Sequence, residues 1–398
     1  MSFKLKQRKI DFINLFLLYL IVTIGLASSS NETRVFIELI RSLSVVLIFF
    51  IVGISLLTSK INYNIVVSIL VVGIFFTTGT LLSIFFGGLQ DFKSDIITLT
   101  LTIIGCYVFS SKHIPINQNM FAKWVIVYCI LIFVISIMLG GLVFSPIPTF
   151  VYGYASDSIG KEIYYSQGIS KIFGYGALAA TSLVVYEKSK TKKYALALIV
   201  LFFIALSLLG GARGDSLFVI ILVVFYFLYR LDIMNSIIAI LFVSISFIFI
   251  ASFISFEDFI IFNRLKALSD NYGSRDVLFE QSVSLLYNEP QCFVHGCGFG
   301  FFQSYYNYRL GLYPHNFVIE LIIVFGFPIA VFMMLLFTKG FFNYIKNNQD
   351  LDFIVLLIIY TLALGLKSGS INTNWLFLVF FLFFITYYIT SKWKKNII

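Results

Sequence analysis

Apolar runs long enough to cross a bilayer recur along almost the whole chain, and they restrict its fold more than any other feature. A membrane-spanning helix needs about 17–25 predominantly apolar residues, and twelve segments have about this length. Only 12% of the residues are charged, whereas soluble domains contain about 25%. The sequence therefore predicts an all-α polytopic membrane protein with about twelve transmembrane helices, which form a single integral membrane domain over residues 1–398. The expected spans are residues 12–27, 35–57, 63–86, 95–111, 122–144, 169–187, 193–209, 215–230, 236–254, 316–338, 351–366 and 374–391.

The basic residues predict the orientation of these spans. They gather at the N-terminus, at the C-terminus and in the loop 188–193. Short loops rich in Lys and Arg stay on the cytoplasmic side, and twelve spans place both termini and this loop on one side. We therefore expect both termini in the cytoplasm. The net charge of +9 follows from this topology, helped by anionic membrane lipid, so no nucleic-acid partner is expected.

One long polar segment, residues 255–315, interrupts the apolar pattern on the opposite, outer side of the membrane. It contains Arg264, Arg275 and Arg309 and ends at His315. Cationic and titratable groups are costly to place at a bilayer, and they therefore suggest function. The guanidinium donors of arginine suit phosphate oxygens, although each arginine has a structural role as its alternative.

Within this segment, apolar residues at helical intervals predict a helix over residues 274–287. Ser274 is its expected N-cap, and we expect the helix to lie against the membrane surface. Arg275 would then stand in its first turn, aimed at the boundary between lipid and water. Arg264 lies eleven residues earlier, on about the same helical face.

Two further residues are candidates for chemistry. Arg213 stands between glycines where a span ends, which permits close approach of a ligand; the alternative is an interfacial arginine that reaches lipid headgroups. His315 stands directly before a span and can accept a proton near pH 7; the alternative is a surface or capping residue. Asn316 can cap the helix that follows, and Glu320 can orient His315 or a nearby arginine.

The cysteines and glycines of the outer segment favour structural interpretations. Cys292 and Cys297 are five residues apart, so a disulfide is permitted, but two free thiols are favoured. The glycine run 296–300 is interpreted as a close-approach turn, with a phosphate-binding nest of backbone amides as the weaker alternative. No cluster has metal-ligand spacing, so neither a metal nor another cofactor is expected.

Taken in order, these motifs resemble the O-antigen polymerase and ligase family, membrane glycosyltransferases of bacterial polysaccharide and lipopolysaccharide biosynthesis. The resemblance covers roughly residues 205–330. One departure is the stretch Gln291–His295, where the family more often passes directly to a small apolar residue and glycine. The motifs that carry the resemblance are Arg213-x-x-x-Leu217, Arg264 through Ser274-Arg275, Asn288-Glu289-Pro290 with the glycine run, and His315-Asn316 through Glu320 and Gly326.

The resemblance implies a GT-C-like, metal-independent enzyme in the bacterial inner membrane, with its active site on the periplasmic face. Its substrate would be an oligosaccharide linked to undecaprenyl diphosphate, and a separate protein would regulate chain length. Arg213 and Arg275 would bind the diphosphate, Arg264 or Arg309 would support them, and His315 would accept or orient the acceptor hydroxyl. A polymerase is favoured; a ligase that transfers finished chains to lipid A-core or protein, and a polysaccharide flippase, are the alternatives.

Overall fold

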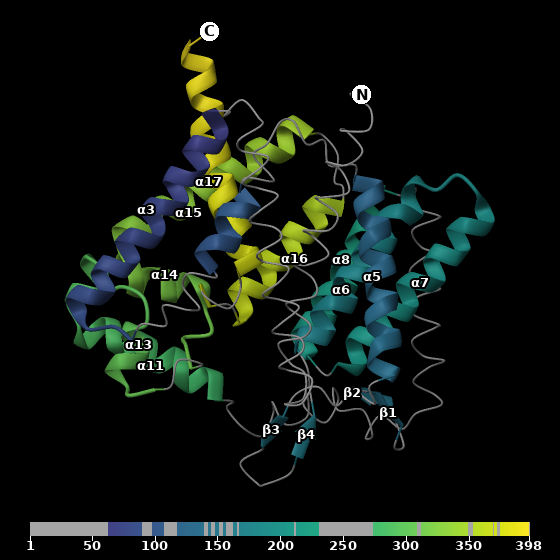
Figure 1. Cartoon of the computed structure of the whole chain (residues 1–398), viewed down its shortest axis with the longest axis horizontal. Helices are drawn as coiled ribbons and strands as arrows, with labels where there is room; N and C mark the ends of the chain where they lie inside the picture. The colour runs from purple at the N-terminus through teal and green to yellow at the C-terminus, as the bar shows by residue number, and fades with distance from the viewer. Residues whose placement is uncertain are drawn as a thin grey trace. The chain divides into compact units, whose positions relative to one another are not determined.

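The structure is a computed structural model of the whole chain (Figure 1). It consists mostly of helices, as the sequence predicts. The residues it describes are 63–89, 98–106, 118–138, 142–144, 148–150, 154–156, 162–164, 167–210, 212–230, 274–308, 312–348, 353–368, 370–371 and 375–397.

Within these residues, five helices are long and apolar enough to cross a membrane, as expected of an integral membrane protein. They lie at or close to predicted spans. The expected spans 12–27, 35–57 and 236–254 lie outside the described residues, so the total of twelve stays a prediction. The five helices are α3 (Tyr63–Phe86), α5 (Gln118–Met138), α6 (Gln167–Tyr186), α7 (Lys190–Leu209) and α15 (Phe327–Asn348).

Contacts between Cα atoms divide the chain into two compact units, which are described separately. Unit 1 contains α5, α6, α7, α8 (Arg213–Arg230) and the first half of α16 (Phe353–Ser368). Unit 2 contains α3, α11 (Ser274–Asn288), α12 (Pro290–Val294), α13 (Phe301–Tyr305), α14 (Phe317–Phe325), α15, the second half of α16, and α17 (Trp375–Ile397).

Helix α6 forms the centre of unit 1, where it packs against α5, α7 and α8. Its small residues permit this close packing, as is usual between membrane helices. A Cβ atom on Gly174 would collide with the Tyr360 hydroxyl, and one on Gly176 would press on Cys129 and Phe203. Of the spanning part of α6, 83% is buried, compared with 28% for α7, so α7 forms an outer wall of the unit.

Two small β-hairpins in unit 1 depart from the all-α prediction. Strand β1 (Leu142–Phe144) pairs antiparallel with β2 (Pro148–Phe150), and β3 (Tyr154–Ser156) pairs antiparallel with β4 (Glu162–Tyr164). The predicted span 122–144 was therefore wrong at its end, because α5 stops at Met138 and residues 142–144 form a strand. The sequence continues Leu139-Gly140-Gly141, and glycine disfavours further helix.

In unit 2, α17 packs along α15 and α3. Its buried phenylalanines form a continuous aromatic core with α15 and α14: the rings of Phe317 and Phe377 are 4.5 Å apart, and those of Phe337 and Phe381 are 5.3 Å apart. This core positions α14, which follows the candidate His315.

The single span predicted over residues 316–338 was wrong, because α14 and α15 are separate helices that meet at Gly326. The φ angle of Gly326 is +81°, in the left-handed region that only glycine adopts readily. A Cβ atom here would also press on the Val294 carbonyl and the Gly296 amide. The break therefore falls at a glycine against which a second backbone packs, and Pro328 lacks the N–H that a continuous helix would bond to the Val324 carbonyl.

Candidate functional site

The glycine turn, residues 295–300, joins α12 to α13 and runs between α14 and α3. Gly296, Gly298 and Gly300 all have positive φ angles, of +81°, +81° and +67°. A Cβ atom on Gly298 would collide with the backbone of Ser83 in α3, and one on Gly300 with that of Leu89. Glycine is therefore required both by the conformation and by the approach of a second backbone.

The amides of residues 295–299 in the glycine turn all donate to protein carbonyls. The last carbonyls of a helix lack partners within the helix, and two of those in α14 are satisfied here: Cys297 N donates to Ile323 O (2.7 Å), and Gly298 N to Val324 O (3.0 Å). Phe299 N donates to a carbonyl of α3 (3.3 Å). The turn thus caps α14, which confirms the structural interpretation over the phosphate nest.

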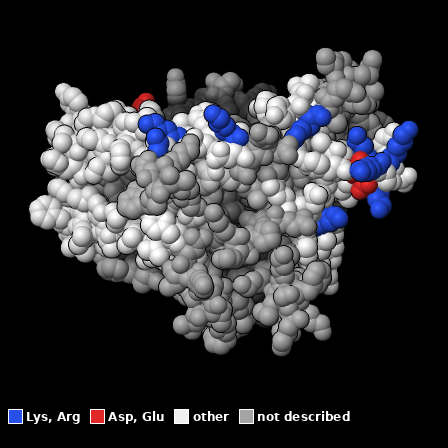
Figure 2. Space-filling model, turned by 90° about the horizontal axis from the view of Figure 1, so that it is seen from above, with Lys and Arg blue, Asp and Glu red and all other residues white. Residues whose placement is uncertain are grey.

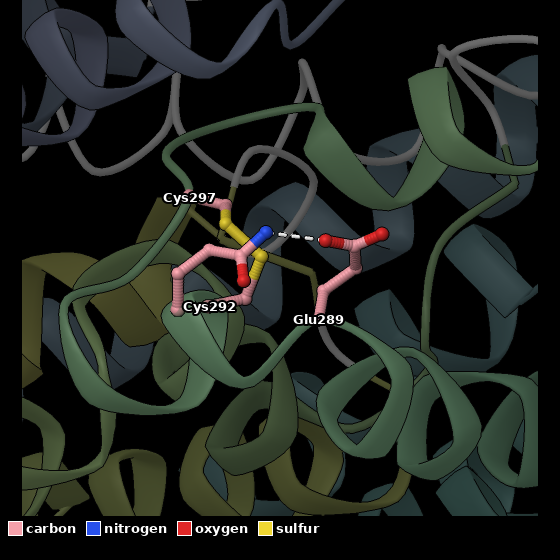
Figure 3. Close-up of a disulfide and its surroundings, with 4 residues drawn as sticks. Glu289, Cys292 and Cys297 are labelled. Atoms are coloured by element: carbon pink, nitrogen blue, oxygen red, sulfur yellow. Dashed lines mark hydrogen bonds between the residues drawn. A yellow bond between two sulfur atoms is a disulfide. The ribbon is translucent and has the colours of Figure 1, made fainter.

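A disulfide closes the base of the glycine turn (Figure 3). Cys292 and Cys297 are joined, with their Cα atoms 4.8 Å apart, and both are fully buried. The expectation of two free thiols was therefore wrong. Beside the disulfide, the Gln291 side chain donates to the Glu289 carboxylate.

Helix α11 confirms the helix predicted over residues 274–287 and packs on the disulfide. Leu278, Leu285 and both cysteines belong to one buried cluster. Two tyrosines that follow the glycine turn bind Gln281 of α11: Tyr306 Oη donates to its carbonyl and Tyr308 Oη to its side-chain oxygen, each at 2.8 Å. Burial raises the pKa of the Tyr306 hydroxyl. These tyrosines therefore help to hold the outer segment together.

His315 has an unusual backbone conformation at the entrance to α14. Its φ angle is +54°, which costs a non-glycine residue about 1–3 kcal/mol and persists only where the surroundings enforce it. The next residue contributes to this enforcement: the Asn316 side chain accepts hydrogen bonds from Val318 N (3.0 Å) and Ile319 N (3.2 Å). The predicted cap is thus confirmed. The ring of Tyr313 lies 4.2 Å from that of His315.

Glu320 fixes α14 from the side of the α16–α17 connection. Its carboxylate accepts hydrogen bonds from Ser370 Oγ (3.1 Å) and Ile371 N (2.9 Å). The sequence reasoning expected Glu320 to orient His315 or an arginine; the structure gives it these two partners instead. Glu320 therefore holds the position of α14, whose first residues follow His315.

Arg213 is the first residue of α8 in unit 1, directly after a turn that buried serines hold in place. The hydroxyls of Ser170 and Ser207 each donate to the other residue's carbonyl at 2.9 Å. Ser216 Oγ donates to Ser207 O (2.8 Å), and Ala212 N donates to Ser170 Oγ (3.3 Å). The start of α8 is therefore firmly positioned.

A buried carboxylate was missed by the sequence reasoning. Asp215 lies in the first turn of α8 and is fully buried. The hydroxyl of Tyr360 donates to the Asp215 carbonyl (3.4 Å). An acidic residue is favourable near a helix N-terminus, and a carboxylate after Arg213 at the edge of a span was the available signal.

Of the other three candidate arginines, only Arg275 lies within the described residues. Arg275 is the second residue of α11, in its first turn as predicted. Arg264 and Arg309 lie outside the described residues. The structure thus brings His315, Asn316 and Glu320 together in unit 2, and it places Arg213 in unit 1. Within the described residues, no group of three or more His, Cys, Asp or Glu could hold a metal ion.

Comparison with protein-family models and with curated proteins found no match for this chain. The similarity to the O-antigen polymerase and ligase family therefore rests on its motifs alone.

Proposed function

We propose that the protein is a membrane glycosyltransferase, an O-antigen polymerase that extends polysaccharide linked to undecaprenyl diphosphate. The observation that carries this proposal is the backbone of His315. His315 has a left-handed backbone conformation and is held on one side by a capped helix. Residues with such strained backbones cluster at functional sites. The ordered motifs from Arg213 to Gly326 supply the substrate class.

In the proposed reaction, a hydroxyl of the acceptor sugar attacks the anomeric carbon of the donor chain. The bond from this carbon to the diphosphate oxygen breaks, and its electron pair leaves with the diphosphate. The imidazole of His315 accepts the hydroxyl proton. Arg213 and Arg275 stabilise the negative charge that develops on the leaving group, because fixed guanidinium groups are most effective in a poorly solvated site. Arg264 and Arg309 are proposed to assist.

The disulfide supports an outer location for this chemistry. Disulfides persist in oxidising compartments such as the bacterial periplasm and are rare in the cytosol. Cys292 and Cys297 lie in the segment that the charge pattern places outside. This agrees with a periplasmic site, where the lipid-linked repeat unit would be presented.

The test is a reconstitution with purified protein, a lipid-linked repeat unit, excess chelator and no nucleotide, read on a gel as a ladder of products. We expect a ladder with the wild type and a loss of about 10²–10⁴-fold in rate with His315→Ala, the usual effect of removing a general base. His295→Ala is the matched control, because this exposed histidine ends α12 in the same segment. A His315→Ala variant that is folded and fully active would refute the proposal.

A second pair of variants tests the arginine at the start of α8. Arg213→Gln should abolish the ladder, whereas Arg230→Gln, at the other end of the same helix, should retain it. Transfer only when lipid A-core is supplied would identify a ligase. Lipid-linked units that accumulate on the cytoplasmic side in cells that lack the protein would identify a flippase.

A further inference from the structure

Unit 1 contains a groove that the proposed glycosyl transfer does not use. It has a volume of about 540 Å³ and lies along α5, α6 and α7, open on one side. This is within the range of small-molecule sites. It lies at the end of the unit where α6 finishes and α7 begins, whereas Arg213 marks the opposite end of α7. Its lining includes Lys123, Glu187 and Lys192 at this end, with Ile126, Leu196 and Ile199 further along the helices.

The charged groups at this end are predominantly basic. Lys123 and Lys192 line the groove, and Lys188, Lys190 and Lys193 belong to the same turn or the turn of helix that follows. Figure 2 looks onto this end and shows basic side chains gathered beside acidic ones at the side where α7 lies.

The acidic member of the groove, Glu187, is already engaged. Its carboxylate accepts a hydrogen bond from Ser189 N (3.0 Å). This bond, followed by the charges of Lys192 and Lys123, holds the pKa of Glu187 below its usual range. The carboxylate therefore stays ionised and offsets part of the basic charge, so the described residues at this end keep a net positive charge.

The walls of the groove include two apolar helices, α5 and α7, whose surfaces are largely exposed. Only 44% of the spanning part of α5 and 28% of that of α7 is buried. Exposed apolar side chains flank the groove on both helices, including Trp124, Leu131 and Leu198. Tryptophan is typical of the boundary between headgroups and acyl chains. An apolar trough that opens among such residues is continuous with the surface that acyl chains cover.

We propose that this groove binds one anionic phospholipid of the leaflet that faces this end, with its phosphate at Lys123 and Lys192 and an acyl chain along Ile126, Leu196 and Ile199. The ammonium groups of lysine bind phosphate as point charges. The long apolar wall favours a lipid over free phosphate, because free phosphate has no acyl chain to pack against this wall.

The test is native mass spectrometry of the purified protein titrated with phosphatidylglycerol or phosphatidylethanolamine. We expect preferential binding of phosphatidylglycerol. A lysine near a membrane surface contributes about a fivefold gain in affinity for anionic lipid, so the double variant K123Q/K192Q should bind about thirtyfold more weakly. K190Q/K193Q is the matched control, because it removes the same charge from the same region without touching the lining. Equal losses in the two double variants would overturn the proposal in favour of general surface attraction.

A further variant tests the acyl-chain part of the site. Ala195 lines the groove and is exposed, so Ala195→Trp should fill the trough without a change in charge. We expect it to weaken phosphatidylglycerol binding, and we expect glycerol 3-phosphate not to displace the lipid. Unchanged binding in Ala195→Trp, or displacement by glycerol 3-phosphate, would overturn the proposal.

Discussion

Replacement of Gly298 by alanine tests the claim that the glycine turn holds α3 and α14 together. The φ angle of +81° costs an alanine about 1–2 kcal/mol. The new Cβ atom would also collide with the backbone of Ser83 in α3, and an added methyl group in tight packing costs about 1–3 kcal/mol. We therefore expect Gly298→Ala to destabilise unit 2 by about 2–5 kcal/mol.

Two other glycines of the same region separate these contributions. Gly87 also has a positive φ angle, of +76°, but a Cβ atom there has nothing within 4 Å, so only the conformational cost of about 1–2 kcal/mol applies. Gly73 lies within α3, also with nothing within 4 Å of a Cβ atom, and alanine is favoured there by about 1 kcal/mol. The expected order of stability is Gly73→Ala, wild type, Gly87→Ala and Gly298→Ala.

The two free cysteines provide the assay. Cys106 in unit 2 and Cys129 in unit 1 are both buried, so a maleimide reacts with them only as each unit opens. Mass spectrometry of the labelled peptides during heating gives a midpoint for each cysteine. We expect the midpoint of Cys106 to fall in the stated order. The reasoning would be refuted if Gly298→Ala unfolded no earlier than Gly87→Ala.

Four further predictions concern the supports of the candidate site. Asn316→Ala removes the cap of α14 and should cost about 1 kcal/mol, which thermal unfolding measures, whereas Asn316→Asp should be close to neutral. Glu320→Met removes both oxygens that accept from the 370–371 turn and leaves the buried Ile371 amide without its partner; it should cost about 1–3 kcal/mol, and a wild-type midpoint would contradict this assignment. Ser207→Ala removes a buried hydroxyl bonded to Ser170 and should destabilise unit 1 by about 1–3 kcal/mol. The unfolding midpoint measured at Cys129 should fall accordingly. Reduction of the Cys292–Cys297 disulfide should destabilise unit 2 by about 2 kcal/mol, the amount expected for so short a loop, and intact-mass analysis should show protein purified without reductant to be two hydrogen atoms lighter than the reduced form.

Local patterns predicted much of unit 2 from the sequence. The span at residues 63–86 matches α3, and the apolar spacing after Ser274 matches α11 closely. The cap at Asn316 was also predictable, because its side chain binds amides only two and three residues away. These features depend on neighbours in the sequence, so their signals are present in the sequence itself.

Not every wrong prediction depended on distant partners, because Gly140 and Gly141 were a local signal for the end of the span 122–144. Hydropathy is continuous across Gly326, although Pro328 was a local signal for the break, because it lacks the N–H that a continuous helix would bond to the Val324 carbonyl. The backbone of residues 294–296 that packs against Gly326 was not predictable from the sequence. The disulfide required α12 and the turn after it to bring the Cα atoms of Cys292 and Cys297 to 4.8 Å from each other. The number of residues between two cysteines does not by itself establish such a distance. The hydrogen-bonded serines Ser170, Ser207 and Ser216 were only weakly predictable, because a serine in an otherwise apolar span does not indicate its partner. The roles of Arg213, Arg275 and His315 stay predictions.

His315 lies at the end of a chain of supports that begins far from it in the sequence. Helix α3 fixes the glycine turn, the amides of this turn cap the C-terminus of α14, and Glu320 ties α14 to the 370–371 turn. A change anywhere along this path can displace His315 without touching it, so loss of activity alone does not identify a catalytic residue. His315→Ala should lower activity by about 10²–10⁴-fold while the unfolding midpoint of Cys106 stays close to that of the wild type, because alanine keeps the Cβ atom and leaves the backbone conformation of residue 315 unchanged. Gly298→Ala should lower both activity and this midpoint. Substitution of a residue that takes part in the reaction should lower activity and leave the unfolding midpoint of Cys106 unchanged, whereas substitution of a supporting residue should lower both.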